Sequence, residues 1–145
     1  MNLEQNNNPV SAGVVILRQL DGDWHYLLLR AYQYWDFPKG LVEDGELEFD
    51  AALREVEEES TLTGLEFHWG YEFFQTAPYG RFRKIARYYI AESASGAVEL
   101  PVSEELGRPE HEEFRWVRFE AAYAMVAPRV RQVLDWSVNI RKQQP

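Results

Sequence analysis

Residues 40–62 of the chain read GLVEDGELEFDAALREVEEESTL, and the spacing of their side chains predicts the helix on which the fold is built. Apolar residues recur at intervals of three and four, which places them on one face of an α-helix. These residues are Phe49, Ala52, Leu53 and Val56. Glu55, Glu58 and Glu59 stand at positions i, i+3 and i+4, so they share a neighbouring face. We therefore expect a helix that packs into a core through one face and presents three carboxylates on another.

The three carboxylates are close enough to repel one another, and like charges at these spacings destabilise a helix. A divalent cation bound among them would remove that repulsion. Carboxylate oxygens are hard ligands, which suit Mg²⁺ or Mn²⁺ rather than zinc. A solvated acidic face is the other interpretation of such a charge run. The spacing alone leaves both interpretations open.

The wider pattern of this stretch resembles the signature of the Nudix hydrolase family. That signature reads Gly, five residues, Glu, seven residues, Arg-Glu, an aliphatic residue, any residue, Glu-Glu, any residue, Gly and an aliphatic residue. The chain departs from it at Thr61, where the family has glycine. Threonine disfavours the left-handed backbone of a helix end and Gly64 follows, so we expect the helix to continue to about Thr63. The matching residues are Gly40, Glu46, Arg54, Glu55, Val56, Glu58, Glu59 and Leu62.

The resemblance extends over essentially the whole chain after its N-terminal tail and implies the Nudix fold. This α/β fold has a mixed β-sheet sandwiched between helices, an α/β/α sandwich. Within the family the chain is most similar to the asymmetric diadenosine tetraphosphate hydrolases, or bis(5'-nucleosyl)-tetraphosphatases. It differs at Tyr34, where relatives often carry histidine, and near Pro128, where it lacks a base-stacking aromatic residue. The matches outside the signature are Trp35, Lys84 and residues 37–40, 88–92, 110–111 and 115–116.

The resemblance also implies a metal site on the acidic face of the helix. Its ligands would be Glu55, Glu58, Glu59 and the carbonyl of Gly40, with Mg²⁺ as cofactor and Mn²⁺ as a substitute. The ions would contact the bridging phosphate oxygens and lower the pKa of the water that attacks phosphorus. Arg54 has the wrong charge for a ligand, and we expect it to fix the rotamer of Glu55.

A carboxylate from the C-terminal half is expected to complete this machinery. Glu110 is the candidate, either as a further metal ligand or as the acceptor of a proton from the attacking water. His111 beside it is expected to position other groups. The catalytic residues predicted in this way are Arg54, Glu55, Glu58 and Glu110, while Glu104, Glu105, Glu112 and Glu113 are alternatives to Glu110.

Basic residues on both sides of the helix are candidates for binding a polyphosphate. Lys39 directly precedes the signature glycine and is expected to reach a substrate phosphate. Residues 81–90 alternate like a strand, which puts Lys84 and Tyr88 on one face, where one would contact phosphate and the other stack on a base. Arg81 belongs to the same basic cluster. An edge strand that carries basic residues for solubility is the alternative interpretation.

The length of 145 residues fits one domain with its own core, so we assign residues 1–9 to a flexible tail and 10–145 to a single Nudix hydrolase domain. We expect a strand at 10–18, its hairpin partner at 24–30 and a final helix at 130–138. A net charge of −9 argues against an extended nucleic-acid surface. With no cysteine, no signal-peptide pattern and no apolar run of membrane-spanning length, we predict a cytoplasmic location. None of these features predicts an oligomeric state.

Together these features predict Mg²⁺-dependent hydrolysis of a small nucleoside polyphosphate. The subfamily resemblance favours asymmetric cleavage of diadenosine tetraphosphate to ATP and AMP. A pyrophosphohydrolase acting on RNA 5' ends or nucleoside triphosphates is an alternative, because residues 37–40 resemble both groups. A non-catalytic domain that senses a nucleotide is a further alternative, although a sensor would not need the acidic residues and Arg54.

Overall fold

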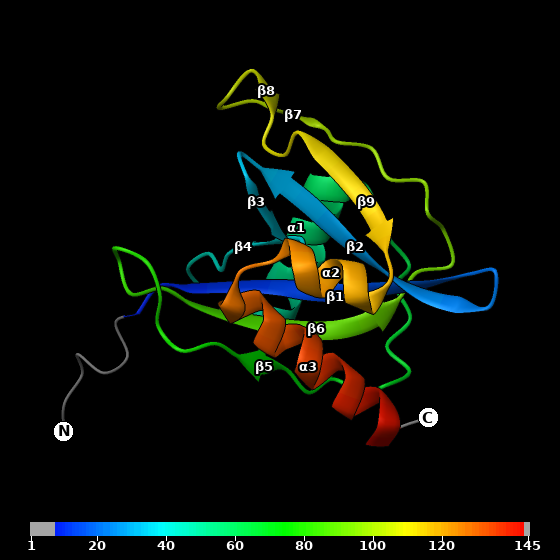
Figure 1. Ribbon diagram of the computed structural model, residues 1–145. Helices are drawn as coiled ribbons and strands as arrows, with labels where there is room; N and C mark the ends of the chain where they lie inside the picture. The colour runs from blue at the N-terminus through cyan, green and yellow to red at the C-terminus, as the bar shows by residue number, and fades with distance from the viewer. Residues whose placement is uncertain (1–7, 144–145) are drawn as a thin grey trace, which may run out of the picture.

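The computed structural model describes residues 8–143 of the chain (Figure 1). Most of the predicted flexible tail therefore lies outside the described residues. The elements in chain order are β1 (Val10–Leu20), β2 (Asp23–Ala31), β3 (Tyr34–Asp36), β4 (Lys39–Leu41), α1 (Glu48–Ser60), β5 (Phe74–Gln75), β6 (Ile85–Glu92), β7 (Val102–Ser103), β8 (Arg108–Pro109), β9 (Glu113–Val117), α2 (Phe119–Met125) and α3 (Pro128–Gln143).

The strand β1 lies in the middle of a mixed sheet with the order β3-β2-β1-β6-β5. It forms the predicted antiparallel hairpin with β2, in which Leu17 is opposite Tyr26. It also pairs in parallel with β6, with Val10 opposite Ile85. The short strand β4 pairs with the beginning of β1, and β9 pairs with β2. The mixed sheet confirms the predicted fold class.

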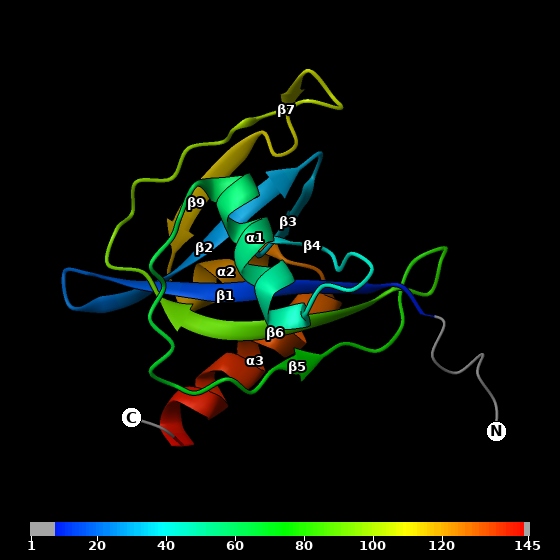
Figure 2. The ribbon, with the colours of Figure 1, turned by 180° about the vertical axis from the view of Figure 1, so that it is seen from behind.

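Helices cover both faces of this sheet. The helix α1 lies on one face, and α2 and α3 lie on the other, as Figures 1 and 2 show from opposite sides. Successive side chains of a strand point to opposite faces, so β1 contributes to two cores. Val14 packs toward α1 in the cluster that contains Val56, whereas Val15 packs in the cluster that contains Leu134 of α3. The signature helix is thus held against the sheet by the apolar face that its spacing predicted.

The C-terminal helix confirms the predicted amphipathic pattern. It begins at Pro128, which fits the first turn because its missing N–H has no partner there. Its buried residues are Val130, Val133, Leu134, Ser137 and Ile140. No helix within residues 8–143 is both long and apolar enough to cross a membrane.

The helix α1 ends earlier than the sequence predicted. Its last residue is Ser60, and Thr61 adopts the left-handed backbone conformation with φ of 66°. The Thr61 N–H donates to the Glu57 carbonyl at 2.9 Å, which closes the last turn. The expected continuation to Thr63 is therefore wrong. The following residue, Leu62, is only 5% exposed, so the chain turns here to bury it and tolerates a left-handed threonine.

The basic segment 81–90 is a strand only from Ile85 onward. The residues before it form a turn in which Arg83 has φ of 53° and donates its N–H to the Gly80 carbonyl. The side-chain amide of Asn8 donates to the Arg83 carbonyl at 2.6 Å, which ties the last part of the predicted tail to this turn. Residues 81–84 therefore do not form a strand, and the alternation of side chains that was predicted for them is absent.

Candidate active site

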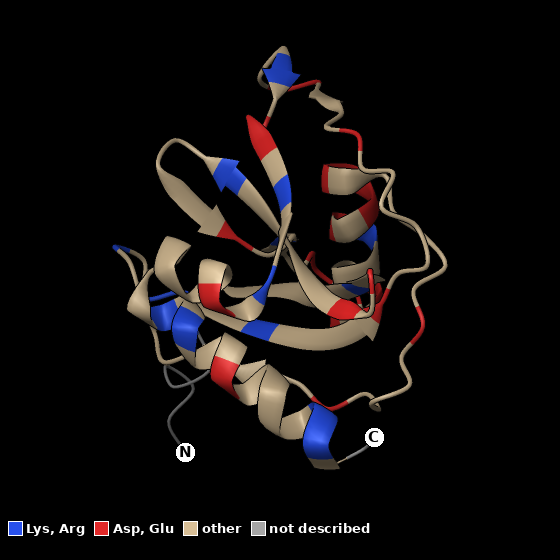
Figure 3. Cartoon of the chain, turned by 45° about the vertical axis from the view of Figure 1, so that its right-hand side comes forward, with Lys and Arg blue, Asp and Glu red and all other residues tan. Residues whose placement is uncertain are grey.

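A cleft of about 910 Å³ opens between the C-terminal half of α1, the strand β4 and residues 100–111. Acidic positions cluster along α1 in Figure 3. The cleft thus brings together residues that are far apart in the sequence. The predicted site residues that line it are Lys39, Gly40, Arg54, Glu55, Glu58, Glu59, Lys84 and Glu110.

Arg54 connects the carboxylates on this side of the cleft. Its guanidinium donates to both oxygens of Glu46, at 2.8 and 2.9 Å, and to Glu55 and Glu58 at 2.8 Å each. It also donates to the Leu41 carbonyl at 3.1 Å. The bond to Arg54 is the largest reason that the pKa of Glu46 is lowered to about 2. The same pairing raises the pKa of Arg54, so Arg54 holds Glu55 as expected and anchors the preceding loop as well.

Gly40 is needed here because the Glu55 carboxylate occupies the space of a side chain. A Cβ atom on Gly40 would overlap that carboxyl group. Burial is the main cause that raises the pKa of Glu55, and the charges of Glu58 and Glu110 add to it. A side chain at position 40 would therefore displace the Glu55 carboxylate from this place.

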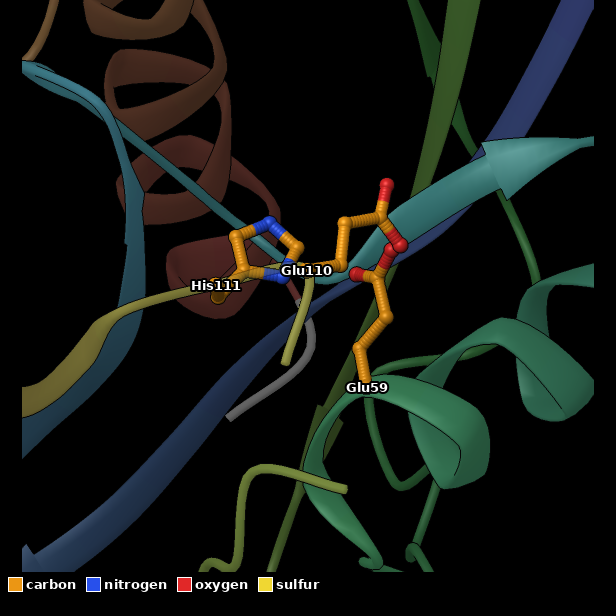
Figure 4. Close-up of side chains that lie close together, drawn as sticks. All are labelled: Glu59, Glu110 and His111. Carbon is orange, nitrogen blue, oxygen red and sulfur yellow. The ribbon is translucent and has the colours of Figure 1, made fainter. Parts of the chain in front are cut away.

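Glu59, Glu110 and His111 form the innermost group of the cleft. Each offers a ligand atom within 4.8 Å of the others, and Figure 4 shows the carboxyl groups of Glu59 and Glu110 side by side. Glu59 is 7% exposed, and burial, reinforced by the charges of Glu110 and Glu55, raises its pKa from 4.5 to about 9. Glu110 is thus the carboxylate that meets Glu59, whereas Glu104 and Glu105 line the cleft outside this group and Glu112 and Glu113 do not line it.

His111 lies in the same pocket without a hydrogen-bond partner for its buried Nδ1 atom. Burial, which disfavours the imidazolium, is the main cause that lowers its pKa. A neutral imidazole beside two carboxylates can accept a hydrogen bond or coordinate a cation. The group as a whole has the oxygen donors that a hard divalent cation requires.

Lys39 lies at the boundary between the cleft and the sheet. Its backbone N–H donates to Glu59 Oε1 at 3.1 Å, while its ammonium group lies 3.7 Å from Asp36 Oδ2. Burial acts to lower the pKa of Lys39, but the negative charge of Asp36 and further neighbouring groups outweigh it and leave the pKa raised. Lys39 is therefore a charged group at the wall of the cleft.

The structure does not bring Tyr88 or Arg81 into the cleft. Tyr88 is fully buried in the core under α3, and its hydroxyl donates to Asp36 Oδ1 at 3.0 Å. The predicted stacking of Tyr88 on a base is wrong for this structure, because the ring has no exposed face. Arg81 is exposed on the turn before β6 and is not among the cleft residues. Of the predicted basic face, Lys84 alone lines the cleft.

The sequence did not predict the polar group that contacts the Lys39 ammonium, which consists of Asp36 and its partners. Asp36 accepts hydrogen bonds from the Phe37 N–H at 2.7 Å and from Arg129 at 3.4 Å. Arg129 also donates to the Tyr88 hydroxyl at 3.3 Å. The position of Asp36 three residues before Lys39 could have indicated an ion pair, but nothing in the sequence connects Arg129 to either residue.

Comparisons with known proteins agree with the fold. A family model described as NUDIX domain matches residues 7–137. The chain is 32% identical over 118 residues to the bis(5'-nucleosyl)-tetraphosphatase [asymmetrical] of Caenorhabditis elegans, with 77% of this chain and 80% of the relative covered. It superimposes on a crystal structure of a C. elegans Ap4A hydrolase binary complex with a TM-score of 0.77 and 26% identity, over 92% of this chain and 98% of the other.

A crystal structure of a NUDIX hydrolase from Listeria monocytogenes also shares the fold, with a TM-score of 0.71 and 20% identity over 94% of this chain and 95% of the other. The predicted resemblance to the family and to its asymmetric tetraphosphate hydrolases is therefore confirmed. The family model covers nearly all of the described residues and includes the cleft built by α1 and β4. The chain belongs to the Nudix hydrolase family.

Proposed function

We propose that the protein hydrolyses a phosphoanhydride bond of a nucleoside polyphosphate with Mg²⁺ or Mn²⁺ as cofactor, and that it cleaves diadenosine tetraphosphate asymmetrically to ATP and AMP. The observation that carries the proposal is that Glu55, Glu58 and Glu59 of α1 share one cleft with Glu110, which Lys39 and Lys84 also line. The name of the C. elegans relative supports the choice of a dinucleoside tetraphosphate.

The donor set of the cleft fits a hard divalent cation. Burial raises the pKa of Glu59 to about 9, and the nearby charge of Lys39 does not offset it. Bound cations would neutralise the phosphate oxygens and make a bound water more acidic. The residues that would hold them are Glu55, Glu58, Glu59, Glu110 and the carbonyl of Gly40.

The chain's own residues then have distinct tasks. Arg54 holds Glu55 and Glu58 in fixed rotamers, since it bonds to both. In the hydrolysis step a water oxygen bonds to phosphorus, the bridging P–O bond breaks, and the leaving phosphate takes the electron pair. Glu110 would accept the proton of that water. Lys39 and Lys84 would bind the phosphate charge along the cleft.

The test is to incubate the protein with diadenosine tetraphosphate and Mg²⁺ in ¹⁸O-labelled water and to identify the products by mass spectrometry. We expect ATP and AMP, with the label in one of them, and no reaction when EDTA removes the metal. Two ADP molecules would contradict the asymmetric cleavage. Release of pyrophosphate from triphosphate-ended RNA, without dinucleotide cleavage, would keep the metal chemistry and overturn the substrate. No turnover of any nucleotide in a panel with Mg²⁺ or Mn²⁺ would overturn the enzyme assignment.

A further inference from the structure

Asp36 is the centre of a polar group on the side of the sheet opposite α1. It accepts hydrogen bonds from the Phe37 N–H at 2.7 Å, from the Tyr88 hydroxyl at 3.0 Å and from Arg129 at 3.4 Å. Tyr88 belongs to the buried core, so its hydroxyl is a fixed donor. Arg129 is held in turn by a cation–π contact with Tyr79, in which the guanidinium carbon lies 4.0 Å from the centroid of the ring. Asp36 is therefore an immobile negative charge.

Lys39 lies between this charge and the carboxylates of the cleft. Its ammonium group pairs with Asp36 at 3.7 Å, and its backbone N–H donates to Glu59 at 3.1 Å. Among residues 8–143, Lys39 forms an ion pair with Asp36 and forms none with Glu59. The ammonium group of Lys39 thus pairs with Asp36, while the backbone of the same residue contacts Glu59, and the charge of Lys39 lowers the pKa of Glu59 without offsetting the burial that raises it.

This choice of partner matters because a lysine ammonium is a mobile point charge on a flexible stem. Released from Asp36, it would find Glu59 and Glu110 close by, and neither has a cationic partner of its own among the ion pairs of the described residues. An ammonium group seated between those carboxylates would repel an incoming divalent cation. The orientation of Lys39 therefore bears directly on metal binding.

We propose that Asp36 is a positioning residue that holds the Lys39 ammonium away from Glu59 and Glu110 and so keeps these carboxylates free for divalent cations. The inference rests on the proposed function, in which the carboxylates bind metal. It adds a role for residues that do not line the cleft. Tyr88, Arg129 and the Phe37 N–H support Asp36 in this role by fixing its orientation.

The test measures Mn²⁺ binding without substrate, by the electron paramagnetic resonance signal of free Mn²⁺, in four proteins. These are the wild type, Asp36→Asn, Lys39→Met and the double variant. Partners that orient a metal site from outside its ligand set typically change affinity by about 10- to 100-fold, so we expect Asp36→Asn to bind Mn²⁺ on the order of tenfold more weakly. Lys39→Met should bind at least as tightly as the wild type. The double variant should bind like Lys39→Met, because no ammonium group remains to be released.

Two results would overturn the inference while leaving the proposed function intact. One is unchanged Mn²⁺ affinity in Asp36→Asn. The other is an equal loss of Mn²⁺ affinity when Asp36→Asn is added to Lys39→Met, which would mean that Asp36 acts only by supporting the local structure. A folded wild type that binds no Mn²⁺ would overturn the proposed function, and the inference with it. If Asp36→Asn does not fold, Tyr88→Phe should show a smaller loss that Lys39→Met again removes, and the absence of that pattern would overturn the inference.

Discussion

Asp36 and Glu59 are two carboxylates on either side of Lys39, and their surroundings are opposite. Asp36 has two cations and a hydroxyl group as partners. Glu59 has one backbone N–H as a partner and lies beside Glu110 and Glu55, whose charges oppose its ionisation. Both groups are largely shielded from water, so the difference lies in what compensates each charge.

Asp36 thus has the surroundings of a structural carboxylate, whereas Glu59 has those of a carboxylate suited to bind a ligand. A buried charge with complete partners has no reason to attract another ion, whereas one without partners either takes up a proton or binds a cation. Under the proposed function, the raised pKa of Glu59 marks the place where a bound cation would compensate a buried negative charge.

Replacing Glu59 by Gln should abolish most of the activity, because the amide keeps the volume and removes the negative charge that a metal requires. We expect turnover to fall by about 10²- to 10³-fold, the range for loss of an important electrostatic group. Glu58→Gln should fall by about 10²-fold or more for the same reason. The measurement is the rate of diadenosine tetraphosphate hydrolysis at saturating Mg²⁺.

The matched control is Glu120→Gln, an identical change at an exposed position on α2. It should leave the rate unchanged. Near-normal turnover of Glu59→Gln would show that the contrast between the two carboxylates has no catalytic meaning.

The same contrast predicts stability changes of opposite sign in the metal-free protein. Asp36→Asn should lower the free energy of unfolding by about 2 kcal/mol, because Arg129 loses a partner in a largely buried site. Glu59→Gln should raise the free energy of unfolding by about 1 kcal/mol, because the glutamine amide carries no charge that has to be protonated or that repels Glu110. Urea denaturation in EDTA would measure both. Two changes of the same sign would contradict the distinction.

Stability should also depend on pH through Glu59. In the folded protein its pKa is about 9, against an ordinary value of 4.5, so between these values the folded state binds a proton that the unfolded state has released. Stability of the metal-free protein should therefore fall as the pH rises through this window. Melting temperatures in EDTA from pH 5 to pH 9 should decline more steeply for the wild type than for Glu59→Gln. Equal slopes would mean that Glu59 ionises normally.

The smallest effect concerns the backbone that follows Glu59. Thr61 has φ of 66°, a conformation that costs a β-branched residue roughly 1–2 kcal/mol more than glycine. Thr61→Gly should therefore stabilise the protein by about 1 kcal/mol, after the entropy of the more flexible unfolded chain is subtracted. Turnover should not change, because neither carboxylate is altered. A destabilised variant would show that the Thr61 side chain contributes more than its backbone costs.

The sequence was sufficient for α1 because one residue pattern sets both of its faces. Spacings of three and four place Val56 against the sheet and Glu55, Glu58 and Glu59 toward the cleft. The end of the helix was predicted wrongly, because the local preference of Thr61 is overruled by burial of Leu62. The family signature, with glycine at this position, was the better guide.

The strand β6 shows what alternation cannot decide. Both faces of a central strand are buried, with Tyr88 packing under α3 and Tyr89 packing toward α1. The alternation therefore predicts which residues of β6 share a face, but it does not predict which face lies near the cleft. The contact between Asp36 and Arg129 was also beyond prediction, since it joins residues 93 positions apart.

A crystal structure of the protein with Mn²⁺ would locate the bound cations through the anomalous signal of the metal. Our prediction is that anomalous peaks lie within coordination distance of Glu59 and of Glu55, Glu58 or Glu110, with Asp36 still paired to Lys39 and Arg129. No peak at these carboxylates at millimolar Mn²⁺, or a peak at Asp36 instead, would contradict it.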